Sequence, residues 1–454
     1  MKVSFIILAA GQGTRMRSAV PKVLHTLAGK PLLQHVVDCA LAAGADEVCV
    51  VHGHGGEVVK AAFAGQPIRW VHQAEQLGTG HAAQLATAGT PEANRVLILF
   101  GDVPLLEPST LRRLLETGNE GDLALLTVDM DDPTGYGRIV RDNGRLVRIV
   151  EQKDASPAEQ AITEINTGVL RAPAGKLKQW LSRLDSNNSQ GEYYLTDVIA
   201  MAVAEGVAVH GVKAGDWKEV MGINDRKQLA EAERALQQRR VEALMEQGVG
   251  FADPARVDIR GTLTCGTDVF IDANVVFEGE VTLGDNVTVE SCNLVRDSSF
   301  GAGTVIHPHC HIEKAVTGAK CEIGPFARLR PGAELEDKVK IGNFVEVKKS
   351  TIAHGSKVNH LSYIGDTTIG TGVNVGAGTI TCNYDGANKY RTVIGDNAFI
   401  GSGVELVAPV EIGAGATIGA GSTITKPAPA EELTVARARQ VTIEGWKKPV
   451  KKPA

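Results

Sequence analysis

An apolar residue recurs at every sixth position through much of the C-terminal half of the chain. The period is clearest in three stretches, from Ile271 to Leu283, from Ile323 to Val347 and from Ile394 to Ile424. A period of six matches neither the turn of an α-helix, at about 3.6 residues, nor the heptad of a coiled coil. Hexads of this kind are typical of a parallel β-helix, in which each hexad forms one side of a coil with its aliphatic residue inside. The repeat therefore predicts a solenoid of short strands.

Glycine is abundant, with 51 residues in a chain of 454. Several glycines directly follow the periodic residue, as in Ile394-Gly395 and Ile418-Gly419. The corner of a coil favours glycine because a side chain would clash there or because φ is positive. The glycine content therefore fits a solenoid, and the lack of a Gly-X-Y period in the sequence excludes collagen.

The overall composition excludes several classes of protein. A hydrophobic share of 43% excludes a mostly disordered chain, and a net charge of −6 argues against a nucleic-acid partner. No apolar run in the sequence approaches the roughly 20 residues of a membrane span. The seven cysteines are an odd number without a CxxC pair, which favours reduced thiols. We expect a cytoplasmic protein without a nucleic-acid or membrane partner, and a solvated basic tail formed by Lys447, Lys448, Lys451 and Lys452.

Up to about residue 225, short apolar runs alternate with stretches of helical spacing. This alternation predicts a Rossmann-like α/β domain, with a mostly parallel sheet covered by helices on both faces. The expected strands are 3–10, 47–52, 96–100 and 124–128, and the expected helices between them are 31–43 and 81–88.

The stretch 225–248 contains no proline and predicts one long charged helix. Asn224 and Asp225 are the candidate N-caps, and Gly248 marks its end. A chain of this length exceeds what one hydrophobic core usually serves. We expect three parts, which are an α/β domain at 1–226, a helical linker at 227–247 and a hexapeptide-repeat β-helix domain at 248–454.

A glycine-rich loop follows the first predicted strand and contains Gly11 and Gly13, with Arg15 and Lys22 beyond them. The dinucleotide motif GxGxxG does not match because Met16 replaces its third glycine, and the P-loop pattern does not match either. Backbone N–H groups in such a loop surround phosphate, and two cations suit a polyphosphate that releases pyrophosphate. The alternative is an ordinary strand–helix turn with two surface cations.

Asp102 follows the predicted strand 96–100, where α/β sheets bind ligands. A single carboxylate there fits a Mg²⁺ site that keeps water and phosphate oxygens as further ligands. The alternative is that Asp102 only caps the next turn.

In the second half, polar segments around 343–349, 357–363 and 381–389 interrupt the hexads. Insertions in a solenoid often carry binding residues. Within them, His360 is suited to accept a proton near neutral pH, although a histidine in a solenoid is more often structural.

Several motifs resemble the sugar-nucleotide pyrophosphorylase family. They are LAAGQGTRM with PKVL, QAEQLGTGHA, FGDVPLL, DPTGYGRIV, IVEQKDA and EINTGV. Together with the hexapeptide half, nearly the whole chain is similar to the family of the bacterial bifunctional N-acetylglucosamine-1-phosphate uridylyltransferase and glucosamine-1-phosphate N-acetyltransferase.

For the first half, the resemblance implies a UTP and UDP-sugar site with Mg²⁺ at Asp102 and Asn224. Arg15 and Lys22 would meet the triphosphate as catalytic cations. Phe100 stands where some members have tyrosine, so any hydroxyl contact is absent. The nucleotide residues would be Leu8, Ala9, Ala10, Gly11, Lys22, Gln73, Gln76, Gly78, Thr79, Phe100, Gly101 and Asp102, with Gly137, Glu151 and Asn166 at the sugar.

For the second half, the resemblance implies that His360 is the catalytic base and that Glu346 orients its ring. It also implies a left-handed β-helix and homotrimers that share acetyl sites, with Ala377 offering its N–H to the thioester oxygen. The sugar-phosphate residues would be Arg330, Lys348, Tyr363 and Asn374, and the acetyl-CoA residues would be Ala377, Asn383, Tyr384, Ser402, Ala420 and Arg437.

The expected function is therefore acetyl transfer to glucosamine-1-phosphate, followed by uridylyl transfer that gives UDP-N-acetylglucosamine. One alternative is a single-activity nucleotidyltransferase with a structural or effector-sensing β-helix, and another is a non-enzymatic scaffold. Two further hypotheses are less favoured, namely zinc at the alternating His307, His309 and His311, and a nucleophilic thiol at Cys382.

Overall fold

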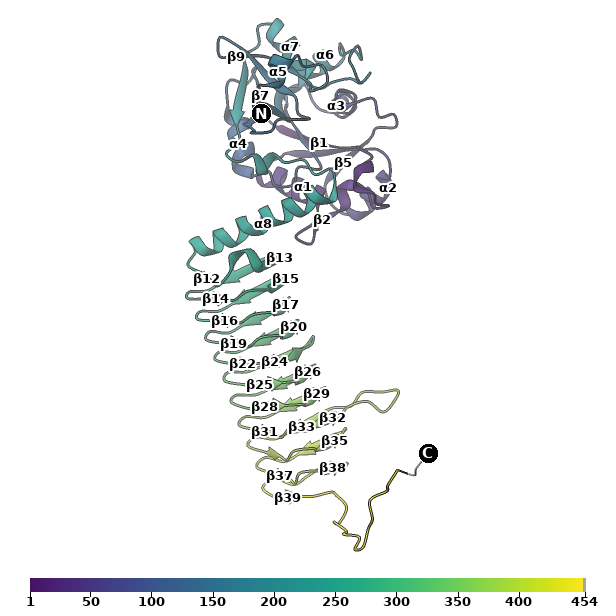
Figure 1. Ribbon diagram of the computed structural model, residues 1–454, viewed down its shortest axis with the longest axis vertical. Helices are drawn as coiled ribbons and strands as arrows, with labels where there is room; N and C mark the ends of the chain where they lie inside the picture. The colour runs from purple at the N-terminus through teal and green to yellow at the C-terminus, as the bar shows by residue number, and fades with distance from the viewer. Residues whose placement is uncertain (452–454) are drawn as a thin grey trace. The chain divides into compact units, whose positions relative to one another are not determined.

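The computed structural model describes residues 1–451 and divides into two compact units, Met1–Leu236 and a second unit that begins at Gln237. The first unit is an α/β fold and the second is a parallel β-helix (Figure 1). Both fold classes predicted from the sequence are confirmed.

A central sheet in the order β11-β7-β10-β6-β1-β4-β5 organises the first unit. Its neighbours β6, β1, β4 and β5 are parallel, whereas β10 is antiparallel to both β6 and β7. The strands are β1 (Val3–Ala9), β4 (Glu47–His52), β5 (Ile68–His72), β6 (Arg95–Phe100), β7 (Leu123–Asp129), β10 (Glu164–Pro173) and β11 (Val209–Lys213), with the attached hairpin β8 (Arg138–Asp142) and β9 (Arg145–Val150).

Helices cover both faces of this sheet because its strands are apolar on both sides. Along β1, Phe5 and Ile7 pack toward one face, whereas Ile6 and Leu8 pack toward the other. The first face is covered by α1 (Leu32–Ala42), α2 (Gly56–Ala62) and α4 (Pro108–Glu116), and the second by α3 (Thr79–Ala88), α6 (Ala174–Leu181) and α7 (Asp197–Ala204). A short helix, α5, spans Pro157–Gln160.

The predicted long helix is α8 (Arg226–Glu246). Asp225 is its N-cap, because the carboxylate accepts a hydrogen bond of 2.8 Å from the backbone N–H of Gln228. The Gln228 side chain in turn accepts from the backbone N–H of Asn224 at 2.7 Å. Gly248 follows the helix with a φ of +96°.

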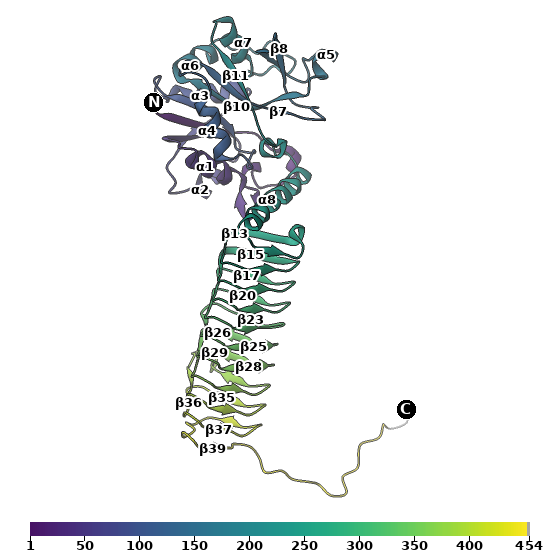
Figure 2. The ribbon, with the colours of Figure 1, turned by 90° about the vertical axis from the view of Figure 1, so that its left-hand side faces the viewer.

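In the second unit, strands pair with the equivalent strands of the next coil. Ile323 pairs with Ile341, which pairs with Val358, so one coil occupies 18 or 17 residues. An 11-stranded sheet runs from β12 (Gly250–Phe251) to β39 (Leu433–Thr434), and a 17-stranded sheet runs from β13 (Val257–Cys265) to β38 (Thr423–Ile424). Figure 2 shows these coils stacked in one direction.

The predicted hexad positions all lie inside the β-helix. From Ile271 to Ile424 these aliphatic and aromatic side chains are at most 3% exposed and form a single core. The hexad period therefore identified the inward-facing residues correctly. They are Ile271, Phe277, Leu283, Ile323, Leu329, Leu335, Ile341, Val347, Ile394, Ile400, Leu406, Ile412, Ile418 and Ile424.

One coil is longer than the others. Val375 pairs with Ile400, 25 positions later, because a loop at 383–391 is inserted between two strands. The loop closes at its base, where the backbone N–H of Tyr390 donates to the carbonyl of Asn383 at 2.9 Å. It stands out from the coils beside β32 (Ile380–Cys382) in Figure 1.

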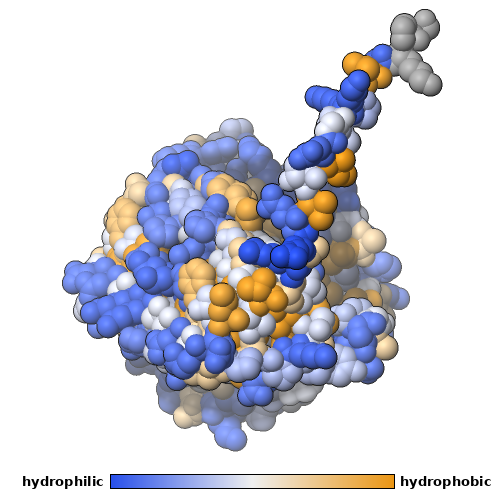
Figure 3. All heavy atoms as spheres, turned by 90° about the horizontal axis from the view of Figure 1, so that it is seen from below, coloured by the Kyte–Doolittle hydropathy of each residue, from blue (hydrophilic) through white to orange (hydrophobic). Residues whose placement is uncertain are grey.

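After β39 the chain continues to residue 451 without helix or strand. The side chains of Lys447, Lys448 and Lys451 are exposed, while the predicted tail residue Lys452 lies outside the described residues. Figure 3 shows hydrophobic residues at the end of the β-helix and alternating with polar ones along the tail. Among the described helices, none has the length and hydropathy needed to cross a membrane.

Candidate active sites

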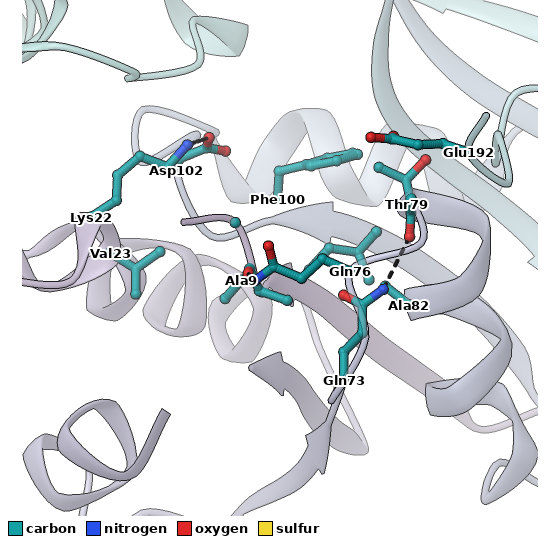
Figure 4. Close-up of a pocket in the computed structure, with 14 residues that line it drawn as sticks. Ala9, Lys22, Val23, Gln73, Gln76, Thr79, Ala82, Phe100, Asp102 and Glu192 are labelled. Carbon is teal, nitrogen blue, oxygen red and sulfur yellow. Dashed lines mark hydrogen bonds and ion pairs between the residues drawn. The ribbon is translucent and has the colours of Figure 1, made fainter. Parts of the chain in front are cut away.

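A pocket of about 280 Å³ opens at the carboxyl ends of β1 and β6 (Figure 4). Its lining joins the glycine loop, the segment before α3 and the residues after β6, which are far apart in the sequence. Of the predicted residues it contains Leu8, Ala9, Ala10, Gly11, Lys22, Gln73, Gln76, Gly78, Thr79, Phe100 and Asp102. Val23, Ala82 and Glu192 also line it.

At one end of the pocket Lys22 points toward Asp102 (Figure 4). Its ammonium donates to the Asp102 carboxylate and lies 3.2 Å from Oδ1 of Asn224. The paired side chains are only 11% and 19% exposed, so water screens their attraction weakly. Two oxygens that converge on one cation are a donor set suited to a hard divalent metal.

The turn before α3 is held in place by its glutamine side chains. Gln76 donates to the carbonyl of Ala10 at 2.7 Å, and Gln73 donates to the carbonyl of Gly78 at 3.2 Å. Gly78 has a φ of +107°, and a Cβ there would lie 2.7 Å from the carbonyl oxygen of Tyr193. This position therefore requires glycine. The fixed amides can present donors and acceptors to a planar base.

A second cavity of about 110 Å³ shares Thr79 and Phe100 with the first. It contains the predicted sugar residues Glu151 and Asn166, while a Cβ on Gly137 would lie 3.4 Å from the Glu151 carboxylate. The remaining lining is mainly apolar, which suits a methyl-bearing group beside polar contacts. It consists of Leu125, Ile149, Gly168, Leu170, Leu195, Thr196 and Ile199.

Two contacts in this cavity were not predicted. The hydroxyl of Thr196 donates to the Glu151 carboxylate at 3.1 Å, while burial raises the pKa of Glu151 above its ordinary value. Gly168 leaves room for Phe100, because a Cβ would lie 2.3 Å from the phenyl ring. The hydrogen bond from Thr196 favours the ionised form of Glu151 that could accept from sugar hydroxyls.

Not every predicted residue reaches the first pocket. Arg15 belongs to the 3-10 turn Thr14–Met16, and its side chain is exposed outside the pocket lining. Gly101 is not part of the pocket lining, and a Cβ there would lie 3.0 Å from the Cβ of Ala9. Of the two predicted cations, Lys22 is the one positioned at the pocket.

The second group of polar residues lies on successive coils of the β-helix. Glu346 in β26 (Glu346–Lys348) is paired in register with Tyr363 in β29 (Tyr363–Gly365). Arg330, one coil earlier, donates to the Glu346 carboxylate at 2.7 Å. Lys348 lies 3.8 Å from the Asp366 carboxylate. Cations at neighbouring positions can bind a phosphate group.

His360 ends β28 (Lys357–His360), and its ring contacts Asn343 instead of Glu346. The distance from Nδ1 to Oδ1 of Asn343 is 3.0 Å. The Glu346 carboxylate, expected to orient this ring, is engaged by Arg330. Sequence reasoning did not identify Asn343 as a ring partner, because hexad spacing shows which residues face outward but not which side chains meet.

The predicted acetyl-CoA residues fall into two groups. Ala377, Ser402 and Ala420 occupy equivalent positions on successive coils. The N–H of Gly403 donates to the Ala377 carbonyl at 2.7 Å, and the N–H of Gly421 donates to the Ser402 carbonyl at 2.9 Å. Arg437 donates to the carbonyl of Ala420 at 2.6 Å. These residues therefore form one column on the β-helix.

The inserted loop contains the other group. Asn383 is 6% exposed, and its amide donates to the Asp366 carboxylate at 2.5 Å, whereas the Tyr384 side chain is 59% exposed. Asn374 lies one strand position from the inward-facing Val375 in β31 (Asn374–Val375). The loop thus fixes the Asn383 amide and presents an exposed aromatic ring.

Comparisons with known proteins match both units. The family model of the MobA-like NTP transferase domain matches residues 5–250, and the bacterial transferase hexapeptide model, of six repeats, matches residues 391–426. The "Bifunctional protein GlmU" of Janthinobacterium sp. (strain Marseille) is 55% identical over 449 residues, which is 99% of each chain. This chain belongs to the GlmU family.

Two further GlmU relatives agree over the full length. The relative from Azoarcus sp. (strain BH72) is 56% identical, and the match covers 98% of this chain and 99% of that relative. The relative from Cellvibrio japonicus (strain Ueda107) is 57% identical, and the match covers 99% of this chain and 100% of that relative. The protein is therefore a bifunctional transferase with uridylyltransferase and acetyltransferase activities. Nucleotidyltransferases of the GlmU family generally use a divalent metal. This relationship disfavours both the single-activity and the scaffold interpretations.

The structure gives no support to a zinc site at the three histidines of this GlmU chain. His307 Nδ1 lies 3.2 Å from Glu290, while His309 stacks on Phe326 with ring centroids 4.9 Å apart. Within residues 1–451, no group of three or more His, Cys, Asp or Glu side chains is arranged to hold a metal ion.

The surroundings of Cys382 favour the protonated thiol. Burial, with a smaller contribution from Glu405, raises its pKa above the ordinary value for a thiol. All cysteines in the described residues are free, as expected from their spacing. A thiolate nucleophile at Cys382 is therefore disfavoured.

Proposed function

We propose that the N-terminal pocket transfers the uridylyl group of UTP to N-acetylglucosamine-1-phosphate, with Mg²⁺ held by Asp102 and Asn224. The observation that supports this most directly is the convergence of both oxygens on the Lys22 ammonium at the end of the pocket of about 280 Å³. In this assignment, the glutamine-lined turn binds uracil and the second cavity binds the sugar.

The reaction needs no general base in this pocket, because the sugar phosphate is itself the nucleophile. One of its oxygens attacks the α-phosphorus of UTP in line, and the bond to pyrophosphate breaks. Lys22 binds the phosphate oxygens and neutralises their growing charge, and a Mg²⁺ ion held by Asp102 and Asn224 would supply further neutralisation. Arg15 remains a proposed contact of the triphosphate, reached by movement of its exposed side chain.

We further propose that the β-helix site transfers the acetyl group of acetyl-CoA to the amine of glucosamine-1-phosphate, with His360 as the base. Arg330 and Lys348 bind the phosphate, with Tyr363 and Asn374 beside the sugar. The Ala377 N–H stabilises the thioester oxygen in the transition state. The column at Ser402 and Ala420, with the loop at 383–391 and Arg437, binds the coenzyme. The adjacency of these groups on consecutive coils supports the assignment.

A two-step assay tests both assignments. Glucosamine-1-phosphate, acetyl-CoA, UTP and Mg²⁺ are supplied together, and each is then omitted in turn while thiol and pyrophosphate release are measured. We expect thiol release to need only the first two compounds, and pyrophosphate release to need all four. His360→Ala should lose thiol release but keep uridylyl transfer to N-acetylglucosamine-1-phosphate. Full acetyl transfer in that variant would contradict the role of His360.

We also propose that the protein assembles as a homotrimer through the β-helix. An exposed apolar column supports this, since Phe326, Phe344 and Leu361 are 48%, 55% and 62% exposed at successive coil corners. The rings of Phe326 and Phe344 stack with centroids 5.3 Å apart. Leu361 adjoins His360, so an interface along this column would place a second copy beside the acetyl site. Analytical ultracentrifugation tests this, and a monomer at micromolar concentration would contradict it.

The remaining expectations stay predictions. They are a left-handed β-helix, a cytoplasmic location and the domain bounds 1–226, 227–247 and 248–454. Separate expression of residues 1–226 and assay of uridylyl transfer would test the first of these bounds.

A further inference from the structure

The ring of His360 is held by a neutral amide from the preceding coil. Asn343 ends β25 (Lys340–Asn343), and it pairs in register with His360 at the end of β28. The two side chains are in contact as well, since His360 Nδ1 and Asn343 Oδ1 are 3.0 Å apart. An amide oxygen can only accept, so this contact requires the proton on Nδ1 and leaves Nε2 with its lone pair.

We propose that Asn343 is the positioning residue of acetyl transfer, holding the tautomer of His360 in which Nε2 is the base that faces the substrate amine. This inference rests on the proposed role of His360. As the amine nitrogen bonds to the acetyl carbon and the carbon–sulfur bond breaks, Nε2 accepts one proton from that nitrogen. The departing thiolate takes up a proton to become the free thiol.

The backbone on both sides of the ring is rigid enough for this role. Gly342, beside Asn343, lies so close to the next coil that a Cβ would be 2.0 Å from the carbonyl oxygen of Asn359. The hydroxyl of Ser362, which is 4% exposed, donates to the His360 carbonyl at 2.8 Å. Close strand approach and this hydrogen bond keep the amide and the imidazole facing one another.

The carboxylate that the resemblance implied as the partner of this ring is engaged elsewhere. Glu346 accepts from Arg330 at 2.7 Å, which aligns a cation proposed to bind the sugar phosphate. The other charged groups on neighbouring strands are Lys357, Lys340, which pairs with Glu322 at 2.7 Å, and Lys348, which faces Asp366. An amide partner thus orients the ring without the negative charge that would stabilise the imidazolium.

Two substitutions in the full-length protein separate orientation from charge. Asn343→Leu keeps the size but removes the acceptor, and it should lower kcat for thiol release about 10- to 100-fold with little change in KM. Asn343→Asp keeps an acceptor but adds a charge, so the acidic limb of the pH–rate profile should move up by about one unit. Asn359→Leu, one position before the histidine, is the matched control and should retain the parental profile.

Uridylyl transfer by the same preparations reports whether the α/β unit is folded, and circular dichroism checks whether the β-helix is folded. The inference would be overturned if Asn343→Leu had the parental kcat for thiol release, or if the acidic limb of the pH–rate profile did not move in Asn343→Asp. His360→Ala distinguishes this failure from that of the proposed function: if it retains acetyl transfer, the base assignment itself is wrong. If Asn343→Leu does not fold, the pH–rate profile of Asn343→Asp alone tests the inference.

Discussion

In the N-terminal unit, the side chains that meet come from distant parts of the chain, whereas in the β-helix they are one coil apart. Lys22 contacts residues 80 and 202 positions away, and His360 contacts a residue 17 positions away. The first arrangement depends on the strand order of a sheet, and the second depends on a constant coil length. Activity at the α/β site should therefore depend mainly on the identity of its residues. Activity at the β-helix site should depend both on the identity of its residues and on the number of residues between them.

The largest expected effect is that of Asp102→Ala in the sheet-built site. Uridylyl transfer should fall by about 10³-fold or more, because a proposed metal ligand and the partner of Lys22 are both lost. Pyrophosphate release from UTP and N-acetylglucosamine-1-phosphate measures this loss. Acetyl transfer by the same preparation is the control and should be unchanged. Retained uridylyl transfer at ordinary Mg²⁺ would refute the metal assignment.

Deleting residues 384–390 tests whether spacing matters in the β-helix. The deletion would reduce the distance between the paired Val375 and Ile400 from 25 positions to that of an ordinary coil. We expect acetyl transfer to fall about 10²-fold or more because Tyr384 and the closure of the loop on Asn383 are lost. Uridylyl transfer should be unaffected. The control for length alone is a variant in which residues 384–390 are replaced by seven Gly and Ser residues, so that the loop keeps its length.

Paired cavity mutations compare how the two units are stabilised. Ile98→Ala in β6 and Ile400→Ala in the β-helix each remove a fully buried side chain. Each should cost about 2–4 kcal/mol of unfolding free energy in its own unit. The urea midpoint for loss of uridylyl transfer should drop in the first variant, and that for loss of acetyl transfer in the second. Equal loss of both activities in both variants would show that the units unfold together.

The smallest expected effects come from ion pairs. Arg141 donates twice to Glu164 at 2.8 Å, and this contact holds the pKa of Glu164 below its ordinary value. Its stabilising contribution is present above the unfolded pKa and is lost as pH falls through the lower folded value. Glu164→Gln should therefore cost about 1–2 kcal/mol at pH 7 and much less near pH 3, as measured by urea unfolding.

The matched pair in the β-helix is Glu278 with Arg296, on successive coils. These side chains are 20% and 41% exposed, so salt screens their attraction more strongly. Glu278→Gln should have a smaller effect than Glu164→Gln, and added salt should reduce it further. A larger effect in the β-helix would contradict the comparison.

Much of the fold was predictable because the sequence shows two patterns, the alternation of strand-like and helix-like segments in the first half and the six-residue repeat in the second. The predicted strand 3–10 is β1 (Val3–Ala9), and the hexad residues lie in one core. The antiparallel insertion of β10 between β6 and β7 was not predicted, because periodicity does not report strand order. Thr196 and Glu192 lie at the cavities without a motif that marks them.

By itself, the sequence determined the two architectures and the long helix, with Asn224 and Asp225 as its candidate caps, and the motifs of the family resemblance named most residues around the first pocket. These features follow from the hydrophobic period, the chemistry of helix caps and short motifs, all of which depend on residues close together in the sequence. Only the tertiary structure decided that Asn343 holds His360 while Glu346 holds Arg330. It also decided that Lys22 and not Arg15 reaches Asp102. The reason is that such contacts depend on where side-chain ends come to lie after packing, which local spacing does not encode.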